Sequence, residues 1–367
     1  MKVLFLGLQN IFGSVNNGGI QCSRKNYDLI SSIVGQDNMF CALICNERID
    51  HANTKYFKRV NRNIESLLAS MFLCRFYMPI IEAEILSYIK TIKPDFIYLD
   101  SSLLGKIIKK TTVPVIVFFH NVESDYAWNR VRHEGLINLL TYFATKYNEK
   151  CSMKAKKIIA LNKRDDERIQ ELYGRKADFL LPITFDDVFE EDKTCSNYKK
   201  EILFCGSLFP PNQISVDWFI TEVLPYLHGV TLNIIGKDFE KEKKKYEKCN
   251  NVKVIGTVEK TDIYYYNHAA VILPIKYGAG MKVKTAEAMM YGRTIFASDE
   301  ALEGYDVDNV EGIWRCNTAQ EYIKAINQYF NRGNFPKYQR AVRNIFKENY
   351  ETKCVRVKFQ EFLNNIL

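Results

Sequence analysis

The sequence lacks the features that mark several common classes of protein. Its ten cysteines are scattered over 367 residues, with no CxxC pair and no cysteine–histidine spacing typical of a zinc site. Several thiols lie in apolar runs, such as Cys205 within residues 202–205, and this pattern favours a reducing cytoplasm over secretion. Apolar residues make up 47% and charged residues 26%, which excludes a disordered chain or a coiled coil and indicates a globular protein.

Long hydrophobic runs are also scarce. Apart from the amino terminus, the longest mostly apolar stretch is residues 67–81, which Arg75 and Pro79 interrupt and which is too short to span a bilayer. The apolar residues 1–8 have no small-residue cleavage site and lead into a glycine loop, so we interpret them as a buried strand rather than a signal peptide. The expected location is therefore the cytoplasm.

The charge balance is basic. The chain has 51 Lys and Arg against 43 Asp and Glu, a formal net charge of +8. Such a surplus favours anionic partners such as nucleotides or phospholipid headgroups. No basic tail is concentrated enough to predict nucleic acid as a partner, and the charged run at residues 241–248 is interpreted as a solvated helix face.

The length and the pattern of apolar runs predict two domains. The first half contains expected strands at residues 2–8, 39–45, 96–100, 113–120, 157–161 and 178–181, with helical patterns at 20–34, 82–91 and 136–153. The second half contains expected strands at residues 202–205, 231–235, 252–255, 270–275 and 294–297, with helical patterns at 215–227, 283–291 and 319–330. Continuous apolar strands alternating with helices predict an α/β fold with two Rossmann-like, doubly wound domains.

The domain boundaries follow from composition. We expect an amino-terminal domain at residues 1–185, an exposed acidic linker at 186–200 and a carboxyl-terminal domain at 201–348. Residues 349–367 are expected to form a terminal helix that can pack back on the first domain. Ligands of doubly wound sheets bind beyond the carboxyl ends of the strands, so the loops after strands are where chemistry is expected.

Two loops of the first half carry candidate groups. Gly18 and Gly19 end a glycine-containing loop directly before a helix, where free backbone N–H groups can approach an anion; a flexible turn is an equally good interpretation. The spacing is not GxGxxG, which weighs against a dinucleotide fold. His120 ends an apolar strand, and its imidazole could orient a hydroxyl or a developing charge, although a structural histidine is the alternative.

Residues 273–292 are the most informative stretch of the second half. A strand ends at Pro274, a glycine loop follows, and a helix is expected to start near Met281, where free N–H groups suit a diphosphate and Lys282 or Lys284 could add positive charge. Glu287 lies among apolar residues, where a carboxylate is costly unless hydroxyls or a cation satisfy it. The alternative is a helical ion pair with Lys284, worth a few tenths of a kcal/mol.

Several motifs together resemble one family. The sequence FCGS at 204–207, PN at 211–212, GTV at 256–258 and the stretch 278–292 resemble the carboxyl-terminal domain of family 4 glycosyltransferases (retaining, group 1). Gly18, Gly19 and His120 fall where the first domain of this family carries its glycine loop and its histidine. The resemblance spans most of the chain, is strong in the second domain, and is weak at residues 46–93, where the acceptor would be expected.

The resemblance implies a GT-B fold, in which two Rossmann-like domains face each other across a cleft. It implies a nucleotide-sugar donor, here a UDP-sugar, and transfer of a hexose with retention of configuration to a glycan or lipid-linked acceptor in bacterial-type surface polysaccharide synthesis. No cofactor and no obligatory metal are expected.

The resemblance also implies roles for individual residues. Glu287 would bind the ribose hydroxyls, the amides of Gly280 and Met281 the phosphate or the sugar, and the backbone of Val258 the base. Gly18 and Gly19 would meet the diphosphate, and His120 would lie beside the donor sugar. The expected catalytic residues are His120, Lys282 and Glu287, and the expected nucleotide-binding residues are Gly18, Gly19, Gly206, Val258, Gly280, Met281, Lys282, Lys284 and Glu287.

Two departures from the family pattern matter. The first of its two usual glutamates is Ala279 here, so the donor sugar must be recognised by backbone amides or other side chains. The basic pair often found after the first strand of the second domain is missing from residues 206–213, so Lys282 is expected to neutralise the phosphate, with Lys284 as the alternative. The sequence DVD at 306–308 matches a metal-binding motif of another transferase fold and is interpreted as a turn.

Other functions remain open. A nucleotide-sugar 2-epimerase shares this architecture, but it would need acid–base carboxylates around the sugar, and Glu123 is the single convincing candidate. A non-catalytic sugar- or lipid-binding protein is the other class, against which Glu287 and His120 weigh. A nicotinamide oxidoreductase ranks last because the glycine fingerprint is missing.

One segment predicts contact with a membrane. Between Asp50 and Glu65 there are four basic residues and no acid: Lys55, Lys58, Arg59 and Arg62. Apolar residues follow at 67–73 and 76–81. Such a segment can lie against the anionic inner face of the cell membrane, and a buried helix after a solvated loop explains it equally well.

Overall fold

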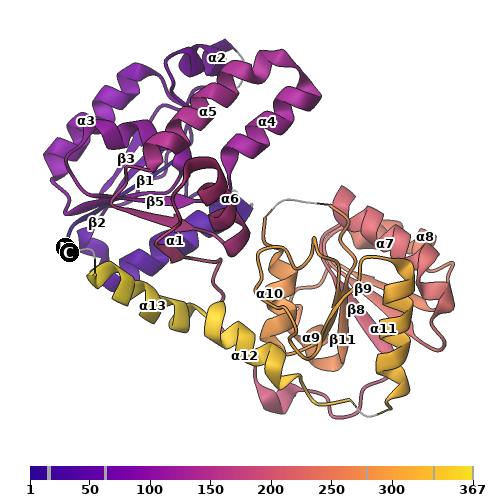
Figure 1. Cartoon of the computed structure of the whole chain (residues 1–367). Helices are drawn as coiled ribbons and strands as arrows, with labels where there is room; N and C mark the ends of the chain where they lie inside the picture. Colours follow the sequence, from indigo (N-terminus) through magenta and orange to yellow (C-terminus); the bar gives the residue numbers. More distant parts are fainter. Residues whose placement is uncertain (15–17, 62–63, 278–279, 334, 366–367) are drawn as a thin grey trace. The chain divides into compact units, whose positions relative to one another are not determined.

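The computed structural model describes residues 1–14, 18–61, 64–277, 280–333 and 335–365. They form two compact units (Figure 1). Unit 1 comprises Met1–Thr184 with Arg356–Leu367, and unit 2 comprises Phe185–Val355. Each unit is a parallel β-sheet with helices, so the expected α/β class with two Rossmann-like domains is confirmed.

Unit 1 contains a seven-stranded parallel sheet in the order β3-β2-β1-β4-β5-β6-β7. The strands are β1 (Val3–Gly7), β2 (Met39–Ile44), β3 (Thr54–Phe57), β4 (Phe96–Leu99), β5 (Val115–Phe119), β6 (Lys157–Ala160) and β7 (Phe179–Leu180). Side chains of β1, β4 and β5 are buried on both faces, which explains their continuous apolar sequences. The edge strand β3 was not predicted, because only one of its four residues is buried.

The helices of unit 1 are α1 (Gly18–Val34), α2 (Ile64–Met71), α3 (Pro79–Ile92), α4 (Glu123–Glu134), α5 (Leu139–Ser152) and α6 (Lys163–Tyr173), with the long 3-10 segment η2 (Ser102–Lys110). The polar helix α4 was not predicted, since its sequence has little apolar periodicity. Its first turn is held by Glu149 of α5, whose carboxylate accepts from the backbone N–H groups of Glu123 at 2.8 Å and Ser124 at 3.2 Å. A tertiary contact therefore caps a helix that its own sequence does not signal.

Unit 2 contains a six-stranded parallel sheet in the order β10-β9-β8-β11-β12-β13. The strands are β8 (Glu201–Cys205), β9 (Thr231–Ile235), β10 (Val252–Gly256), β11 (Ala270–Leu273), β12 (Thr294–Ala297) and β13 (Ile313–Arg315). The helices are α7 (Pro210–Glu222), α8 (Lys243–Tyr246), α9 (Asp262–Asn267), α10 (Val283–Met290), α11 (Ala319–Asn331) and α12 (Arg340–Asn349). Helix α7 starts five residues before the expected position, because Pro210 and Pro211 fit the first turn, where no N–H is needed.

Glycines bring three strand ends of unit 2 close together. Gly206 follows β8, Gly236 follows β9, and Gly256 ends β10. A Cβ on Gly236 would lie 1.9 Å from the carbonyl oxygen of Gly206, and one on Gly256 would lie 2.7 Å from a Glu240 carboxylate oxygen. Both glycines also have positive φ, 139° and 82°. Glycine is therefore required for these loops to meet at the carboxyl edge of the sheet.

Residues 186–200 are mostly exposed, as expected of a linker, but two of them have buried partners in unit 2. Tyr198 is 7% exposed, and its hydroxyl donates to the Lys337 carbonyl at 2.7 Å and accepts from Arg293 at 2.6 Å. Asp187 forms an ion pair with Arg343 at 2.6 Å. Asp187 and Tyr198 thus tie the stretch to buried arginines of unit 2, to which it belongs.

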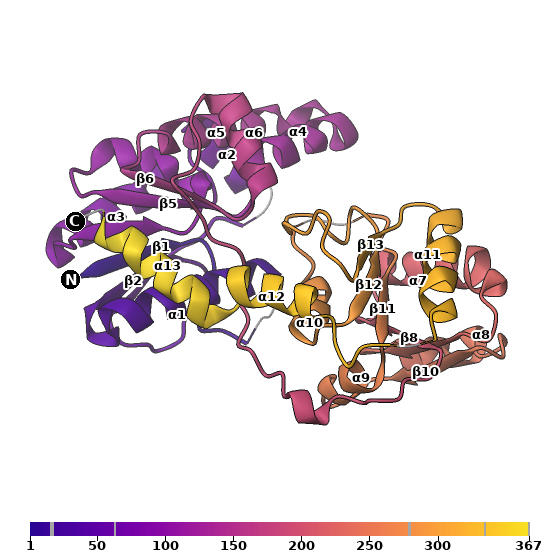
Figure 2. The same ribbon diagram turned by 60° about the horizontal axis from the view of Figure 1, so that its bottom comes forward.

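The carboxyl-terminal residues return to unit 1. Helix α13 (Thr352–Asn364) lies along α1 (Figure 2), where Arg356 donates to the Ser32 carbonyl at 2.8 Å. Phe359 and Phe362 pack on Phe179 of β7, with ring centroids 5.6 and 4.9 Å apart. Among the described helices of the whole chain, none is both long and apolar enough to cross a membrane.

Candidate functional site

Lys284 lies at the carboxyl edge of the unit 2 sheet. It is the second residue of α10, and its amine donates to the side-chain carbonyl of Asn212 on α7. A Cβ on Gly206 would lie 3.1 Å from the Lys284 amine and 2.8 Å from the Asn212 amide. The structure therefore brings together Gly206 and Lys284, two of the residues predicted from sequence, and adds Asn212 as the group that orients the amine.

Glu287 lies one turn further along α10. One of its carboxylate oxygens accepts from the hydroxyl of Tyr265 on α9 at 3.2 Å. Tyr265 is fully buried and stacks on Tyr291, with ring centroids 4.8 Å apart and an angle of 4° between the rings. The carboxylate is thus held by a rigid aromatic pair, which leaves its second oxygen available for a further donor.

The predicted alternative for Glu287, a helical ion pair with Lys284, is not what the described structure contains. The Lys284 amine extends to Asn212, and the two charges act on each other only over a longer distance. Burial raises the pKa of Glu287, opposed by the Tyr265 hydrogen bond and by Lys284. Burial lowers the pKa of Lys284 to about 8. Burial therefore makes the charged form of each group unfavourable, and hydrogen bonds or charges from a bound ligand could offset this desolvation cost.

Lys282 occupies a different environment. Its amine contacts two carboxylates, Glu300 at 2.7 Å and Glu303 at 3.1 Å, and donates to the Gly280 carbonyl at 2.7 Å. The hydroxyl of Tyr305 donates to the Lys282 carbonyl at 2.8 Å. These contacts anchor the segment before α10 to the loop after β12, so the charge of Lys282 is already balanced by protein groups.

The other predicted residues of unit 2 lie at the same edge of the sheet. Gly280 has a positive φ of 67° with open space at its Cβ position, and Met281 is 7% exposed. Helix α10 starts at Val283, two residues later than expected, so Gly280 and Met281 form its approach. Val258 follows Thr257, which is held by Glu240 through its backbone N–H at 2.9 Å. Ala279 lies outside the described residues.

In unit 1, His120 follows β5 and is bound to Asp100, which follows the neighbouring strand β4. The His120 Nε2 lies 3.0 Å from the Asp100 carbonyl and 3.3 Å from its carboxylate. Two helix α1 side chains share that carboxylate, the Ser23 hydroxyl at 2.5 Å and the Asn26 amide at 3.2 Å. Burial is the largest influence and lowers the pKa of His120, but Asp100 and Cys22, through charge and hydrogen bonding together, raise it well above its usual value. Asp100 therefore favours the protonated form of the imidazole.

Gly18 and Gly19 form the first residues of α1, about one turn before Ser23. A Cβ on Gly18 would meet no atom within 4 Å, so its backbone is approachable. Arg24 of the same helix fixes the preceding loop by donating to the Ile11 carbonyl at 2.6 Å and to the Gly13 carbonyl. Residues 15–17 of the predicted glycine loop lie outside the described residues.

Three contributors to these sites were missed in the sequence. Asp100 could have been found, because it ends a buried strand and neighbouring parallel strands place their ends together. Asn212 appears in the PN motif, but its contact with Lys284 depends on the packing of α7 against α10. The sequence does not distinguish Tyr265 from the adjacent Tyr264 and Tyr266, because the orientation of α9 decides which of the three side chains reaches Glu287.

The acidic motif at 306–308 takes part in local contacts. Asp308 accepts from Arg315 at 2.5 Å, and the backbone N–H of Asp306 donates to the Tyr350 hydroxyl at 3.0 Å. In the part of the chain that the structure describes, no group of three or more His, Cys, Asp or Glu side chains is arranged to hold a metal ion.

Comparison with known families locates the sequence signal in unit 2. Residues 199–332 match the family Glycosyl transferases group 1. The group 1 region includes β8 to β12 and α10, and so contains Gly206, Lys284 and Glu287. A relative from Klebsiella pneumoniae, described as an uncharacterized 44.6 kDa protein in the cps region, is 24% identical over 374 residues, which is 93% of this chain and 94% of the relative.

Solved structures share the fold over the whole chain. The lipopolysaccharide outer core galactosyltransferase WaaB superimposes with a TM-score of 0.70 at 17% identity, covering 100% of both chains. HepE of Anabaena in complex with UDP superimposes with a TM-score of 0.66 at 14% identity, also covering 100% of both chains. At these identities the likeness shows the fold.

The buried amine of Lys284 predicts a pH-dependent stability. Because its pKa is lowered from 10.5 to about 8, the unfolded chain binds more protons than the native one between these values, and this group's cost falls as pH rises through that window. We expect Lys284→Met to raise the free energy of unfolding by roughly 1–3 kcal/mol at pH 7. Urea unfolding of both proteins at pH 7 and above 10 should show this difference shrinking. A difference that stays constant would contradict a lowered pKa.

Proposed function

We propose that this protein is a glycosyltransferase that takes a sugar from a UDP-sugar and passes it to an acceptor. The observation that supports this proposal best is the placement of Glu287 and Lys284, each buried and held by its own neutral partner, on α10 inside the group 1 region. Ribose hydroxyls are suitable donors to the Glu287 oxygen that Tyr265 leaves available. HepE, which shares the fold, is known in complex with UDP.

The geometry favours Lys284 over Lys282 for the phosphate. Lys282 already has two carboxylate partners, whereas Lys284 has a neutral one, Asn212, beside Gly206. A diphosphate beside Lys284 would replace solvent lost on burial and would keep the amine protonated. The backbone of Gly206, Gly280 and Met281 would complete the phosphate site, and the backbone of Val258 would meet the base.

The reaction that we propose retains the configuration at the sugar and uses no metal cofactor. Such a transfer depends on positioning and on stabilising the charge that develops as the sugar–phosphate bond breaks. His120, whose protonated form Asp100 favours, would lie beside the donor sugar and stabilise the negative charge that develops on the leaving phosphate. Gly18 and Gly19 would place N–H groups of α1 toward the diphosphate.

The acceptor that we propose is a glycan or a lipid-linked saccharide of a surface polysaccharide, and the transferred sugar is a hexose. The Klebsiella relative is described as lying in the cps region, and WaaB as a lipopolysaccharide outer core galactosyltransferase. Both descriptions support synthesis of a cell-surface polysaccharide from cytoplasmic donors.

Glu287→Ala tests the nucleotide site. Hydrogen bonds to a charged group are worth about 1.5–3 kcal/mol, so the loss should weaken UDP binding by roughly tenfold to over a hundredfold. Glu287→Gln should lose less because it keeps the volume and one acceptor. Calorimetric titration with UDP, and with GDP for comparison, measures the effect.

The control is Glu222→Ala, which removes an exposed carboxylate at the end of α7 and should leave UDP affinity unchanged. A well-folded Glu287→Ala protein that binds UDP as tightly as the parent would remove Glu287 from the nucleotide site.

His120→Ala tests the catalytic role in unit 1. We expect turnover to fall by about 10²-fold, as when one charge-stabilising donor is removed, with UDP affinity and melting temperature nearly intact. Asp100→Asn removes the charge that raises the pKa of His120 and leaves burial, which lowers it, so we expect activity to fall with rising pH at a lower pH in the variant than in the parent. Unchanged turnover in His120→Ala would exclude the histidine from the mechanism.

A peripheral membrane contact is a further part of the proposal. Arg59, one of the four basic residues predicted to meet the membrane, is bound within the protein, where it donates to the Leu8 carbonyl at 2.6 Å. Arg62 lies outside the described residues. Exposed apolar side chains gather instead on α2 and on the segment from α4 to α5: Ile64, Leu68, Met71, Phe72, Tyr126, Trp128, Leu136, Ile137, Leu140 and Phe143. We propose that this apolar surface meets the inner face of the cell membrane.

Flotation with anionic liposomes at low salt checks the contact. The parent should float with the vesicles, and Leu136→Ser combined with Phe143→Ser should reduce the bound fraction severalfold. Ile263→Ser, which changes an exposed apolar residue of unit 2, is the matched control. Absence of the parent protein from the vesicle fraction would end the membrane proposal and leave a soluble acceptor.

A further inference from the structure

A cavity of about 720 Å³ lies within unit 1, and neither His120 nor the start of α1 is among its lining residues. Helices α2, α4 and α5, grouped in Figure 1, supply most of its walls. Its lining combines apolar, hydroxyl and charged side chains, among them Ile64, Arg75, Glu123, Arg130, Ile137 and Thr145. Its rim belongs to the proposed membrane surface, but its buried polar end has no role in the proposed transfer.

Arg75 is the unusual member of the lining. It is 7% exposed, yet its Nε has no hydrogen-bond acceptor among the described residues. Its other contacts are weak: one terminal nitrogen lies 3.4 Å from the Ser70 hydroxyl, and the guanidinium lies 4.8 Å from the Phe76 ring centroid. A buried guanidinium normally has a carboxylate or phosphate partner, so this one lacks the partner its chemistry requires.

The surroundings of Arg75 are cationic. Burial lowers the pKa of Arg75 to about 10; the charge of Glu123 opposes this change, and the neighbouring Arg130 and Arg59 add to it. Glu123 lines the same cavity but forms no ion pair with Arg75 in the described structure. Arg130 pairs with Glu134 at 2.6 Å on the exposed side. The guanidinium edge of Arg75 is therefore left for a group from outside the protein.

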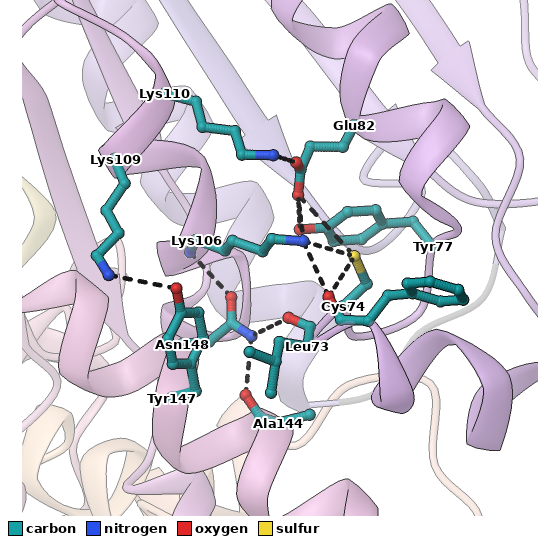
Figure 3. Close-up of polar contacts among 11 residues, drawn as sticks. Leu73, Cys74, Tyr77, Glu82, Lys106, Lys109, Lys110, Ala144, Tyr147 and Asn148 are labelled. Atoms are coloured by element: carbon teal, nitrogen blue, oxygen red, sulfur yellow. Dashed lines mark hydrogen bonds and ion pairs between the residues drawn. The ribbon is translucent and has the colours of Figure 1, made fainter.

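The backbone just before Arg75 is held by contacts from other elements, among them those of Leu73 with Asn148 (Figure 3). The Asn148 amide donates to the Leu73 carbonyl at 3.0 Å, and the Lys106 amine donates to the Phe72 carbonyl at 2.9 Å. Lys106 also pairs with the buried Glu82 at 3.2 Å. Leu73 adopts φ 55° and Phe76 adopts φ 64°, conformations that cost non-glycine residues free energy. The fold thus holds a strained turn that places Arg75 at the cavity.

Thr145 supplies a second group without a partner. It is fully buried on α5, it lines the cavity, and its hydroxyl has no hydrogen-bond partner within the described part of the chain. Apolar side chains lie at the other end of the lining, where Ile64 is 77% and Ile137 is 68% exposed. The cavity therefore offers hydrogen-bond donors at its buried end and an apolar rim toward solvent.

We infer that this cavity binds the phosphate-type oxyanion of an amphiphile, with Arg75 and Thr145 as its hydrogen-bond donors and the apolar rim against its hydrocarbon chain. An oxyanion supplies the paired acceptors that a guanidinium edge fits. The role of this ligand as the acceptor of sugar transfer rests on the proposed function; the binding site does not.

Dodecyl phosphate is the probe, titrated calorimetrically into the full-length protein below its micellar concentration. Arg75→Met should weaken its binding by about tenfold to a hundredfold, since the charged donor is lost. Thr145→Val should weaken it severalfold. Glu123→Gln should strengthen it, because a negative charge is removed from the cavity. Inorganic phosphate, which lacks the chain, should bind far more weakly than dodecyl phosphate.

Arg132→Met is the matched control, since it removes an exposed arginine of the same α4 surface that does not line the cavity. A purely structural Arg75 predicts that Arg75→Met melts earlier than the parent. An unpartnered buried charge predicts a melting temperature that is equal or higher. If Arg75→Met fails to fold, the Thr145→Val and Glu123→Gln titrations still decide.

The outcomes separate this inference from the proposed function. Binding of dodecyl phosphate that depends on Arg75, without any binding of UDP, would keep the cavity site and overturn the glycosyltransferase. Binding of UDP with no binding of dodecyl phosphate would overturn the cavity site alone. Equal affinity in the parent, Arg75→Met and Thr145→Val proteins would also overturn it, and tight binding of inorganic phosphate would overturn the role of the chain.

Discussion

All strands in each of the two sheets run parallel, and this arrangement dictates where charge can be placed. The faces of a parallel sheet are covered by helices, so its central strands are mostly apolar. Charged groups gather at the ends of the strands, and parallel strands bring their carboxyl ends to one edge. Asp100 and His120 in unit 1, and Gly206 with Lys284 in unit 2, are the consequences of this constraint.

Desolvation at these edges distinguishes residues that sequence alone treats as equivalent. Lys282 and Lys284 are two residues apart and follow the same glycine loop. Lys282 turns toward Glu300 and Glu303 and serves as an anchor, whereas Lys284 is buried beside a neutral amide and its pKa falls to about 8. A charge without a counter-charge is costly in the free protein and favourable once an anion binds. The same reasoning distinguishes Glu287, held by a tyrosine, from an exposed helical ion pair.

The pattern of apolar runs predicted the two sheets well, because buried parallel strands have a strong local signal. It failed where tertiary contacts decide. Strand β3 is half polar and exists through pairing with β2, and α4 depends on a cap from Glu149. Residues 186–200 are mostly exposed as predicted, but the ion pair of Asp187 with Arg343, far away in sequence, could not be predicted. Motif spacing located Glu287, Lys284 and His120, but their partners Tyr265, Asn212 and Asp100 required three-dimensional packing.

The burial of Arg75 could not be predicted from the apolar pattern of the sequence. In the sequence it interrupts a hydrophobic stretch and serves only to argue against a membrane span. In the fold, the flanking backbone is strained and tied to Asn148 and Lys106, so that a guanidinium is buried without a partner. A chain under selection for stability alone could replace it with methionine at little cost in packing. On our inference, the strained turn serves to present Arg75 to an anion, and this function accounts for its unfavourable burial.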